Sequence, residues 1–406
     1  MMLYELKPHQ YATVRALFEP LWYHLVIFSA IEGYTPARIV ADNPEHPTVA
    51  FVWDQVEGGY YLAGDPDHGA FNRALNRFIR DEIYPQAQAG EGTQLDLVLN
   101  YAPMAWERVL DDVLAGINAM RHTRQHFLFR EQRVPDWRDR VPQGFEMVEV
   151  DAGFLQRTGL QHMQEHVLRW IREAWGIEGF LERGFGCCLV RGDTIVSWCI
   201  GDYAVGCACE MGIHTAEGYR RRGYATLTVS ATLEQCLARG LTEIGWHCWS
   251  ANHASAATAR KAGFRQTVEH PVYHAWYNAI DNWLVQAKMY SDGPAGNTVQ
   301  PVDDGAAAMA YRQALALVES DPALAERARI WGNLALRPYL YHDAARAHLH
   351  IGDLAVARSC LDQAIEAGLP RERLQQLLQD EALAHLHHTA AWQDLVAHLA
   401  GPGTNG

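Results

Sequence analysis

The 406-residue sequence lacks several features that mark common protein classes. No uncharged apolar run reaches the ~18 residues that a membrane-spanning helix needs. The stretch Met1 to Glu5 is not a basic segment leading into a long apolar run, so we expect no secretion signal. The sequence has no Gly-x-x-x-x-Gly-Lys loop and no Gly-x-Ser-x-Gly elbow. The sequence therefore gives no support for a nucleoside triphosphatase or a serine hydrolase.

Positive charge and cysteine are also scarce. The formal net charge is −14, which argues against a general binder of nucleic acid or of anionic membranes. Eight cysteines in so long a chain, two of them adjacent at Cys187 and Cys188, do not resemble a disulfide framework. We expect reduced thiols and a cytoplasmic location. With 49% apolar and 20% charged residues, the chain is typical of globular proteins.

The length predicts two or three domains. Residues 130–144 contain two prolines and several charges, and residues 291–304 are rich in turn formers, so both segments suit links between folded units. The sequence therefore predicts domains at 1–130, 145–290 and 304–400.

The first two of these regions mix helix and strand signals. In the first, we expect strands at 47–53, 59–63 and 95–99 and a helix at 71–83. In the second, the order of elements indicates an α/β or α+β fold with a mainly antiparallel start, and we expect α+β. The expected elements there are a helix at 155–175, strands at 185–191, 194–201 and 207–214, a helix at 224–239, a strand at 243–249, a helix at 254–262, and strands to about 277.

The third region is rich in Ala and Leu and predicts an all-α domain of helical hairpins. Residues 341–370 fit a hairpin of ~34 residues with Gly352 at its turn, the spacing of a tetratricopeptide (TPR) repeat. The packed face would carry Ala357, Leu361 and Ala364. A plain helical bundle also fits this composition.

The most informative motif is Arg220-Arg221-Arg222-Gly223-Tyr224-Ala225, which lies between an expected strand and an expected helix. A glycine-bearing turn at the start of a helix exposes backbone N–H groups that have no partner inside the helix. Together with the helix dipole, these donors form a phosphate site. The motif therefore predicts a ligand that contains a diphosphate.

Residues 145–280 resemble the GNAT N-acetyltransferase superfamily. The resemblance is carried, in order, by the strand Glu210 to Thr215, the Arg/Gln-x-x-Gly-x-Gly/Ala loop at 220–225, the strand at 243–249, Asn252 with Ser255, and the ending Lys261-Ala262-Gly263-Phe264. The first region, with Ala41-Asp42-Asn43-Pro44 and Tyr61 to Asp65, resembles the N-terminal half of a two-part bacterial branch of that superfamily. The resemblance implies a duplicated GNAT fold with a degenerate first copy.

The resemblance also implies acetyl-CoA as co-substrate and an amine as acceptor, with no metal. The loop amides would bind the diphosphate, the strand ending at Ile213, His214 and Thr215 would pair with the pantetheine arm, and Asn252 and Ser255 would flank that arm. The implied diphosphate-binding residues are Arg220, Arg221, Arg222, Gly223, Tyr224, Ala225 and Thr226.

The chemistry requires an unprotonated amine. A lysine-like amine has a pKa of about 10.4, so its neutral form costs roughly 4.6 kcal/mol at pH 7, and a base helps. Strand alternation places Glu210 on one face with Gly212 and His214, which makes Glu210 the candidate base. Family members often carry a tyrosine as general acid where this sequence has Ala259. Tyr224, Tyr273 and Tyr277 stay open as substitutes.

Two histidine patterns compete with this interpretation. His162-Met163-Gln164-Glu165-His166 fits the His-x-x-Glu-His pattern of inverted zinc peptidases, and His385, His387 and His388 form a trio. We interpret the first as a solvated or acceptor-lining helix face and the trio as surface histidines, and we expect no metal at either.

The sequence thus predicts an acetyl-CoA-dependent N-acetyltransferase that acts by direct attack in a ternary complex. The alternative is an acyl-CoA-responsive adaptor whose helical domain binds a protein partner. The missing tyrosine at position 259 favours the adaptor. We expect no nucleic-acid or membrane partner.

Overall fold

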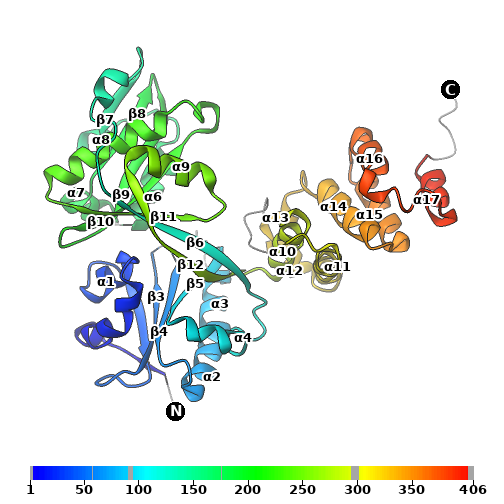
Figure 1. Cartoon of the computed structure of the whole chain (residues 1–406), viewed down its shortest axis with the longest axis horizontal. Coiled ribbons are helices and arrows are strands. Elements are labelled where there is room, and N and C mark those ends of the chain that lie inside the picture. Colours follow the sequence, from blue (N-terminus) through cyan, green and yellow to red (C-terminus); the bar gives the residue numbers. More distant parts are fainter. Residues whose placement is uncertain (1–2, 57, 90–94, 175, 294–300, 401–406) are drawn as a thin grey trace. The chain divides into compact units, whose positions relative to one another are not determined.

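A computed structural model describes residues 3–56, 58–89, 95–174, 176–293 and 301–400 (Figure 1). The chain forms two compact units. Unit 1 comprises Met1–Ile83 and Leu97–His274, and unit 2 comprises Tyr84–Asp96 and Ala275–Gly406.

Unit 1 is built on one mixed sheet of 12 strands in the order β1-β2-β3-β4-β5-β12-β6-β11-β10-β9-β8-β7. The α+β fold with an antiparallel start is confirmed. The first six strands come from the first half of the unit: β1 (Tyr4–Glu5), β2 (Ala37–Ala41), β3 (Val49–Asp54), β4 (Gly59–Gly64), β5 (Asp96–Ala102) and β6 (Met120–Phe129). The second half supplies β7 (Glu146–Glu149), β8 (Gly186–Arg191), β9 (Thr194–Val205), β10 (Ala208–Thr215), β11 (Glu243–Trp249) and β12 (Phe264–Trp276).

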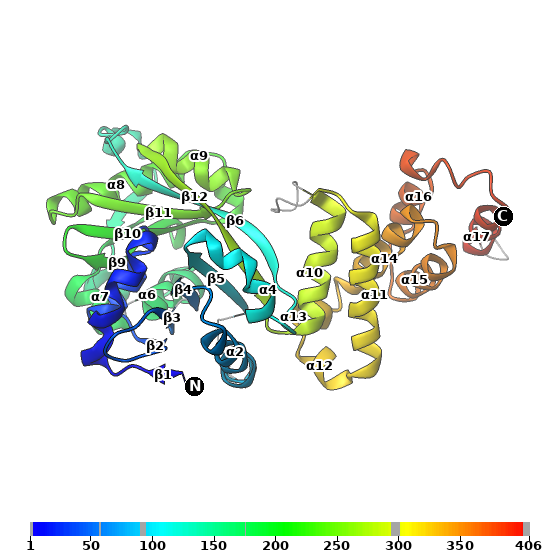
Figure 2. The same ribbon diagram turned by 60° about the horizontal axis from the view of Figure 1, so that its bottom comes forward.

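The two halves exchange their last strands. β6 pairs antiparallel with β11 of the second half, whereas β12 lies between β5 and β6 (Figure 2). The chain between the halves is also structured. It contains η4 (Trp137–Arg140), and Trp137 is buried in a cluster with residues of α8 (Tyr224–Ala238). The halves therefore share one continuous sheet.

The predicted helix at 155–175 is confirmed only in its second part. Helical structure begins at Met163 with the π-helix η5 (Met163–Leu168) and continues as α6 (Arg169–Ala174), whereas residues 156–162 are not helical; α7 (Gly176–Arg183) follows. A left-handed residue, His162, starts η5 with φ 69°. The other helices of unit 1 are η1 (Pro8–Leu21), α1 (Leu25–Ile31), α2 (Gly69–Phe78), η2 (Ile79–Ile83), η3 (Met104–Arg108), α4 (Leu110–Val113), α5 (Ala152–Leu155), η6 (Glu217–Tyr219) and α9 (His253–Ala262).

Each central strand presents two different faces. On one face, Met211 and Trp246 pack in a hydrophobic cluster with Val229 of α8 and Ala259 of α9, and we call this the α8 face. Because side chains alternate along a strand, the neighbouring positions point the other way. Polar residues of β10, β11, β6 and β12 occupy this second side, which we call the histidine face: Glu210, His214, His247, His126 and His270.

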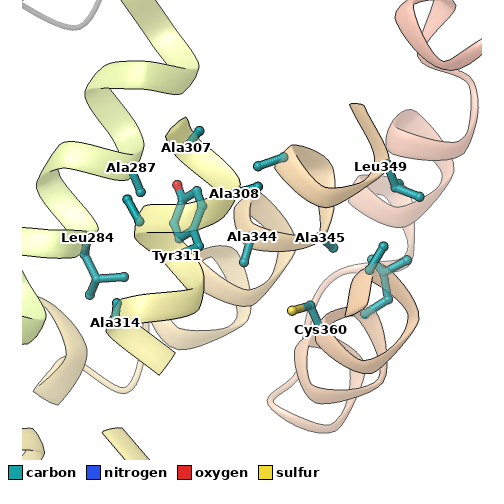
Figure 3. Close-up of a cluster of buried hydrophobic side chains, with 14 of the residues drawn as sticks. Leu284, Ala287, Ala307, Ala308, Tyr311, Ala314, Ala344, Ala345, Leu349 and Cys360 are labelled. Atoms are coloured by element: carbon teal, nitrogen blue, oxygen red, sulfur yellow. The ribbon is translucent and has the colours of Figure 1, made fainter. Parts of the chain in front are cut away.

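Unit 2 is a helical region with the predicted hairpin. α14 (Arg337–His350) and α15 (Leu354–Glu366) are joined at Gly352, which has φ 77°, and Ala357, Leu361 and Ala364 are buried as expected. The hairpin is TPR-like, and its small residues let neighbouring helices pack closely (Figure 3). The remaining helices are α3 (Tyr84–Ala89), α10 (Ala279–Asp292), α11 (Asp304–Ser320), α12 (Pro322–Arg327), α13 (Arg329–Gly332), α16 (Arg371–Leu378), η8 (Glu381–Leu383) and α17 (Ala390–Ala400).

Within the described residues, no helix combines the length and the apolar character that crossing a membrane requires.

Candidate active site

A fork between β10 and β11 dominates the second half of unit 1. These two strands run parallel and pair only from Ala208 with Glu243 to Glu210 with Gly245. Beyond that point β11 continues along β6, while β10 stays paired with β9. In the described part of the chain, residues 211–215 of β10 therefore have no strand partner on the fork side.

The main chain of β10 is oriented to use this gap. The N–H of Ala216 donates to the carbonyl of Val196, which fixes a hydrogen-bonded pair between the end of β10 and β9. Hydrogen-bonded and non-hydrogen-bonded pairs alternate along antiparallel strands. Ile213 and Thr215 consequently direct their backbone groups into the fork, as an extra strand would need.

The arginine loop follows directly at the end of β10. Arg221 and Gly223 both adopt left-handed conformations, with φ 62° and 84°, and Gly223 is the N-cap of α8. A Cβ at Gly223 would meet nothing within 4 Å, so the space in front of this turn is open. Arg220, Arg221 and Arg222 are exposed.

No side chain in the described ranges caps α8. Among the described residues we find no acceptor for the N–H groups of Tyr224, Ala225 and Thr226, the first turn of the helix. Uncapped amides at a helix start, next to arginines, form a favourable anion site. Arg220 also closes the end of the fork, because its Nε donates to the carbonyl of Thr215 (3.1 Å).

Asn252 and Ser255 both have structural contacts. The side chain of Asn252 is the N-cap of α9 and accepts from the N–H of Ser255 (3.1 Å). The hydroxyl of Ser255 accepts from Nε1 of Trp246 (3.0 Å). The amide NH₂ of Asn252, on an exposed residue, remains available as a donor.

Glu210 lies at the base of the fork and contacts the first half of the unit. The backbone N–H of Leu25, the first residue of α1, donates to its Oε1 (2.7 Å). The side chain is 12% exposed, and Nε2 of His247 lies 3.6 Å from the same oxygen. The first half thus supplies a contact to the candidate base that the sequence did not reveal.

Beside Glu210 lies a group of four histidines, which we call the histidine cluster: His24, His126, His247 and His270. The rings of His24 and His247 stack at 4.8 Å, and those of His126 and His247 lie 4.7 Å apart. Nε2 of His247 contacts the carbonyl of Tyr23 (2.7 Å), so this nitrogen carries the proton.

Burial holds three imidazoles of the histidine cluster neutral, those of His24, His126 and His270. Burial, followed by neighbouring histidines, lowers the pKa of His126 to about 2. It likewise lowers the pKa of His270 to about 2, and that of His24 well below its usual range. Nε2 of His24 and both ring nitrogens of His270 have no hydrogen-bond partner within the described residues.

A second carboxyl group, Asp202, adjoins Glu210 at a bulge in β9. Nε1 of Trp170 donates to its Oδ1 (2.6 Å). Burial raises the pKa of Asp202 to about 8, hydrogen bonds from Trp170 and Gly212 oppose this rise, and the charge of Glu210 adds to it. At neutral pH the carboxyl group of Asp202 is therefore mostly protonated. Trp170 covers Gly212 so closely that a Cβ there would overlap its ring.

His214 packs against η5. Its ring stacks on that of His166 at 4.5 Å. Burial foremost, and then His166, lowers the pKa of His214 to about 4.

The position of the usual tyrosine offers no general acid. Ala259 is fully buried in the core against α8. Tyr273 points to the opposite face of the sheet from His270, three residues earlier on β12. The ring of Tyr224 packs against Phe145 at 5.1 Å, and Tyr277 belongs to unit 2.

The corresponding strands of the first half form no fork. β4 and β5 pair in parallel along five positions, from Gly59 with Val98 to Ala63 with Ala102. The next turn carries Asp65 and Asp67, and the side chain of His68 caps α2. Asp67 pairs with Arg108 (3.3 Å), and the turn offers no cluster of arginines like that at 220–222.

Comparisons with known proteins agree with this geometry. The GNAT acetyltransferase family model matches residues 15–273. An uncharacterized N-acetyltransferase, YdfB of Bacillus subtilis (strain 168), is 24% identical over 276 residues, 68% of this chain and 99% of the relative. A crystal structure of a GCN5-related N-acetyltransferase-like protein from Streptococcus suis covers 66% of this chain and 98% of its own, with a TM-score of 0.50 and 22% identity.

The matched residues span both halves of unit 1 and exclude the hairpins of unit 2. Since the family model covers more than half of the chain, and the fork and the arginine loop lie inside it, the chain belongs to the GNAT acetyltransferase family.

Proposed function

We propose that the chain transfers an acetyl group from acetyl-CoA to an amine by direct attack in a ternary complex. The observation that carries this proposal is the open fork at Glu210 next to the uncapped start of α8. The fork offers backbone groups at Ile213 and Thr215 to the pantetheine arm. The amides from Arg221 to Thr226 would bind the diphosphate, with Arg220, Arg221 and Arg222 adding charge.

In this proposal Glu210 is the base, acting directly or through a water. Its Oε1 is anchored by the N–H of Leu25, which fixes the carboxylate at the fork. Because Asp202 beside it is mostly protonated, Glu210 has no second negative charge next to it from that residue. The leaving thiolate needs little help, because a thiol with a pKa near 8.5 leaves at a cost of ~2 kcal/mol at pH 7.

The division of labour is also a proposal: a degenerate GNAT-like domain at 1–130, a catalytic domain at 145–290 and a TPR-like domain at 304–400. The closed pairing of β4 with β5 and the acidic turn at Asp65 and Asp67 support the degeneracy of the first. The exchanged strands mean that neither of the first two domains completes its sheet alone.

The cofactor site is tested by Gly223→Trp, with acetyl-CoA affinity measured by calorimetry and folding by circular dichroism. We expect binding to be lost in a folded protein, because the indole would fill the open space before α8. Gly240→Trp is the matched control: Gly240 ends the same helix, has φ 76° and likewise has nothing within 4 Å. Full affinity in folded Gly223→Trp would overturn the loop assignment.

Catalysis is tested by release of free CoA from acetyl-CoA with a panel of amines. The panel should contain small amines, aminoglycosides, peptide N-termini and lysine peptides. Turnover with any of them supports the transferase. Acetyl-CoA binding without release for any amine would favour the acyl-CoA-responsive adaptor, consistent with the buried Ala259.

A further inference from the structure

The His-x-x-Glu-His segment has no role in the proposed acetyl transfer, yet its side chains converge. One ligand atom from each of His162, Glu165 and His166 lies within 4.8 Å of the other two. We propose that these three residues bind a divalent transition-metal ion of the zinc class. The site lies on the histidine face, beside strand β10.

The separations match tetrahedral coordination. Zn–N and Zn–O bonds of about 2.0–2.1 Å at tetrahedral angles put ligand atoms roughly 3.4 Å apart and two imidazole centroids about 5 Å apart. Nδ1 of His162 lies 3.1 Å from Oε1 of Glu165, and the two imidazole centroids are 5.3 Å apart. Small side-chain rotations would complete the site, because His162 and Glu165 are 33% and 57% exposed.

The backbone brings these ligands together at a local cost. His162 occupies the left-handed region, which costs a residue with a Cβ roughly 1 kcal/mol, and η5 is a π-helix, a form common at functional sites. With this backbone the ring of His162 still lies 5.3 Å from that of His166.

The charges around the three residues act in opposite directions. Glu165 offers a carboxylate oxygen to a cation, whereas Arg169 is a positive charge nearby that opposes metal binding.

A stacked histidine connects the proposed metal site to β10. His214 of β10 stacks on His166 with an interplanar angle of 18°, which fixes the orientation of a ligand ring. A bound ion would therefore hold η5 against β10. Because the proposed site uses Glu165 as a ligand, this carboxylate would not be free to act as the base of a peptidase, and we assign the ion a structural or regulatory role.

Metal binding is tested on the whole chain, stripped with a chelator, by calorimetric titration with zinc chloride and by the visible spectrum after addition of cobalt chloride. We expect one equivalent of zinc at micromolar affinity and a tetrahedral cobalt spectrum. His162→Asn, whose side chain tolerates the left-handed backbone, and His166→Gln should each weaken binding at least ten-fold.

His9→Gln and His388→Gln, both at exposed positions, are the controls and should keep the affinity. Zinc should also raise the melting temperature of the wild type but not of His166→Gln. Absence of binding tighter than millimolar, or unchanged affinity in both ligand variants, would overturn the proposal. Neither readout depends on acetyl transfer.

Discussion

Acidification should destabilise unit 1 through the histidine cluster. The folded pKa values of His126 and His270 are about 2, that of His24 is also far below 6.5, and the unfolded chain has ordinary histidines near 6.5. A histidine with a lowered folded pKa contributes stability that is present above pH 6.5 and is lost as the pH falls. From pH 7.5 to 5.5, each one costs about 1.4 kcal/mol, roughly 4 kcal/mol for the three.

Other groups near the histidine cluster also titrate or carry charge, so a difference between variants is needed. Glu210 approaches it from β10, Arg124 from β6 and Tyr23 from the segment before α1. His270→Leu removes one titrating ring without losing a hydrogen bond, since neither nitrogen has a partner among the described residues. Between pH 7.5 and 5.5 the free energy of unfolding of the variant should fall by about 1.4 kcal/mol less than that of the wild type.

The assay is urea unfolding at pH 7.5 and 5.5, followed by hydrogen exchange in peptides from β6 and β12, so that unit 1 is observed separately from unit 2. His46→Leu, at an exposed position, is the control for replacing an imidazole by an apolar side chain. Equal pH dependence in the wild type and in His270→Leu would refute the claim that burial keeps this ring neutral.

Three further substitutions test the base of the fork. Glu210→Gln should lower turnover by about 10²–10⁴ with nearly unchanged acetyl-CoA affinity, because Gln still accepts from Leu25; exposed Glu243→Gln is the control, and unchanged turnover would remove Glu210 as base. Gly212→Ala should lower the free energy of unfolding by roughly 1–3 kcal/mol, because the new methyl group displaces Trp170. Gly218→Ala, where the methyl group enters open space, is the control, and equal unfolding midpoints for the two variants would contradict the overlap. A carboxyl with a raised pKa loses its contribution to stability as the pH rises, and Asn does not titrate. Between pH 6 and 7 the free energy of unfolding of Asp202→Asn should therefore rise relative to that of the wild type by up to about 1.4 kcal/mol. If urea denaturation gave the same difference between the two proteins at both pH values, Asp202 would be ionised.

Much of the second half could be predicted because its signals are local. Glycines and alternating apolar residues mark β8 to β11, and the turn at Gly223 separates β10 from α8. The hairpin around Gly352 could be predicted for the same reason, because a glycine turn separates two helical segments. Register with distant strands has no such signal. The placement of β12 between β5 and β6 joins segments more than 100 residues apart, and no turn fixes it.

The residues that the sequence did not single out share this long-range origin. Leu25 contacts Glu210 through its backbone, so its side chain carries no signal. Asp202 follows an apolar strand and looks like an ordinary strand end, yet a bulge buries it beside Glu210. The break at His162 was also hidden, because the helical spacing of 155–175 continues across the left-handed residue.

The difference between the two halves of unit 1 is a matter of register as well as residue type. Both halves place a parallel strand pair before a helix, but β4 stays paired with β5 for five positions, whereas β10 leaves β11 after three. Comparing the two halves by sequence reveals Asp65 and Asp67 where the second half has arginines, and this difference argues against diphosphate binding in the first half. The sequence does not reveal that the first half also lacks the gap between strands that a pantetheine arm would need. Replacing Asp65 and Asp67 by arginine would thus create an anion site in the first half without a place for the rest of the coenzyme.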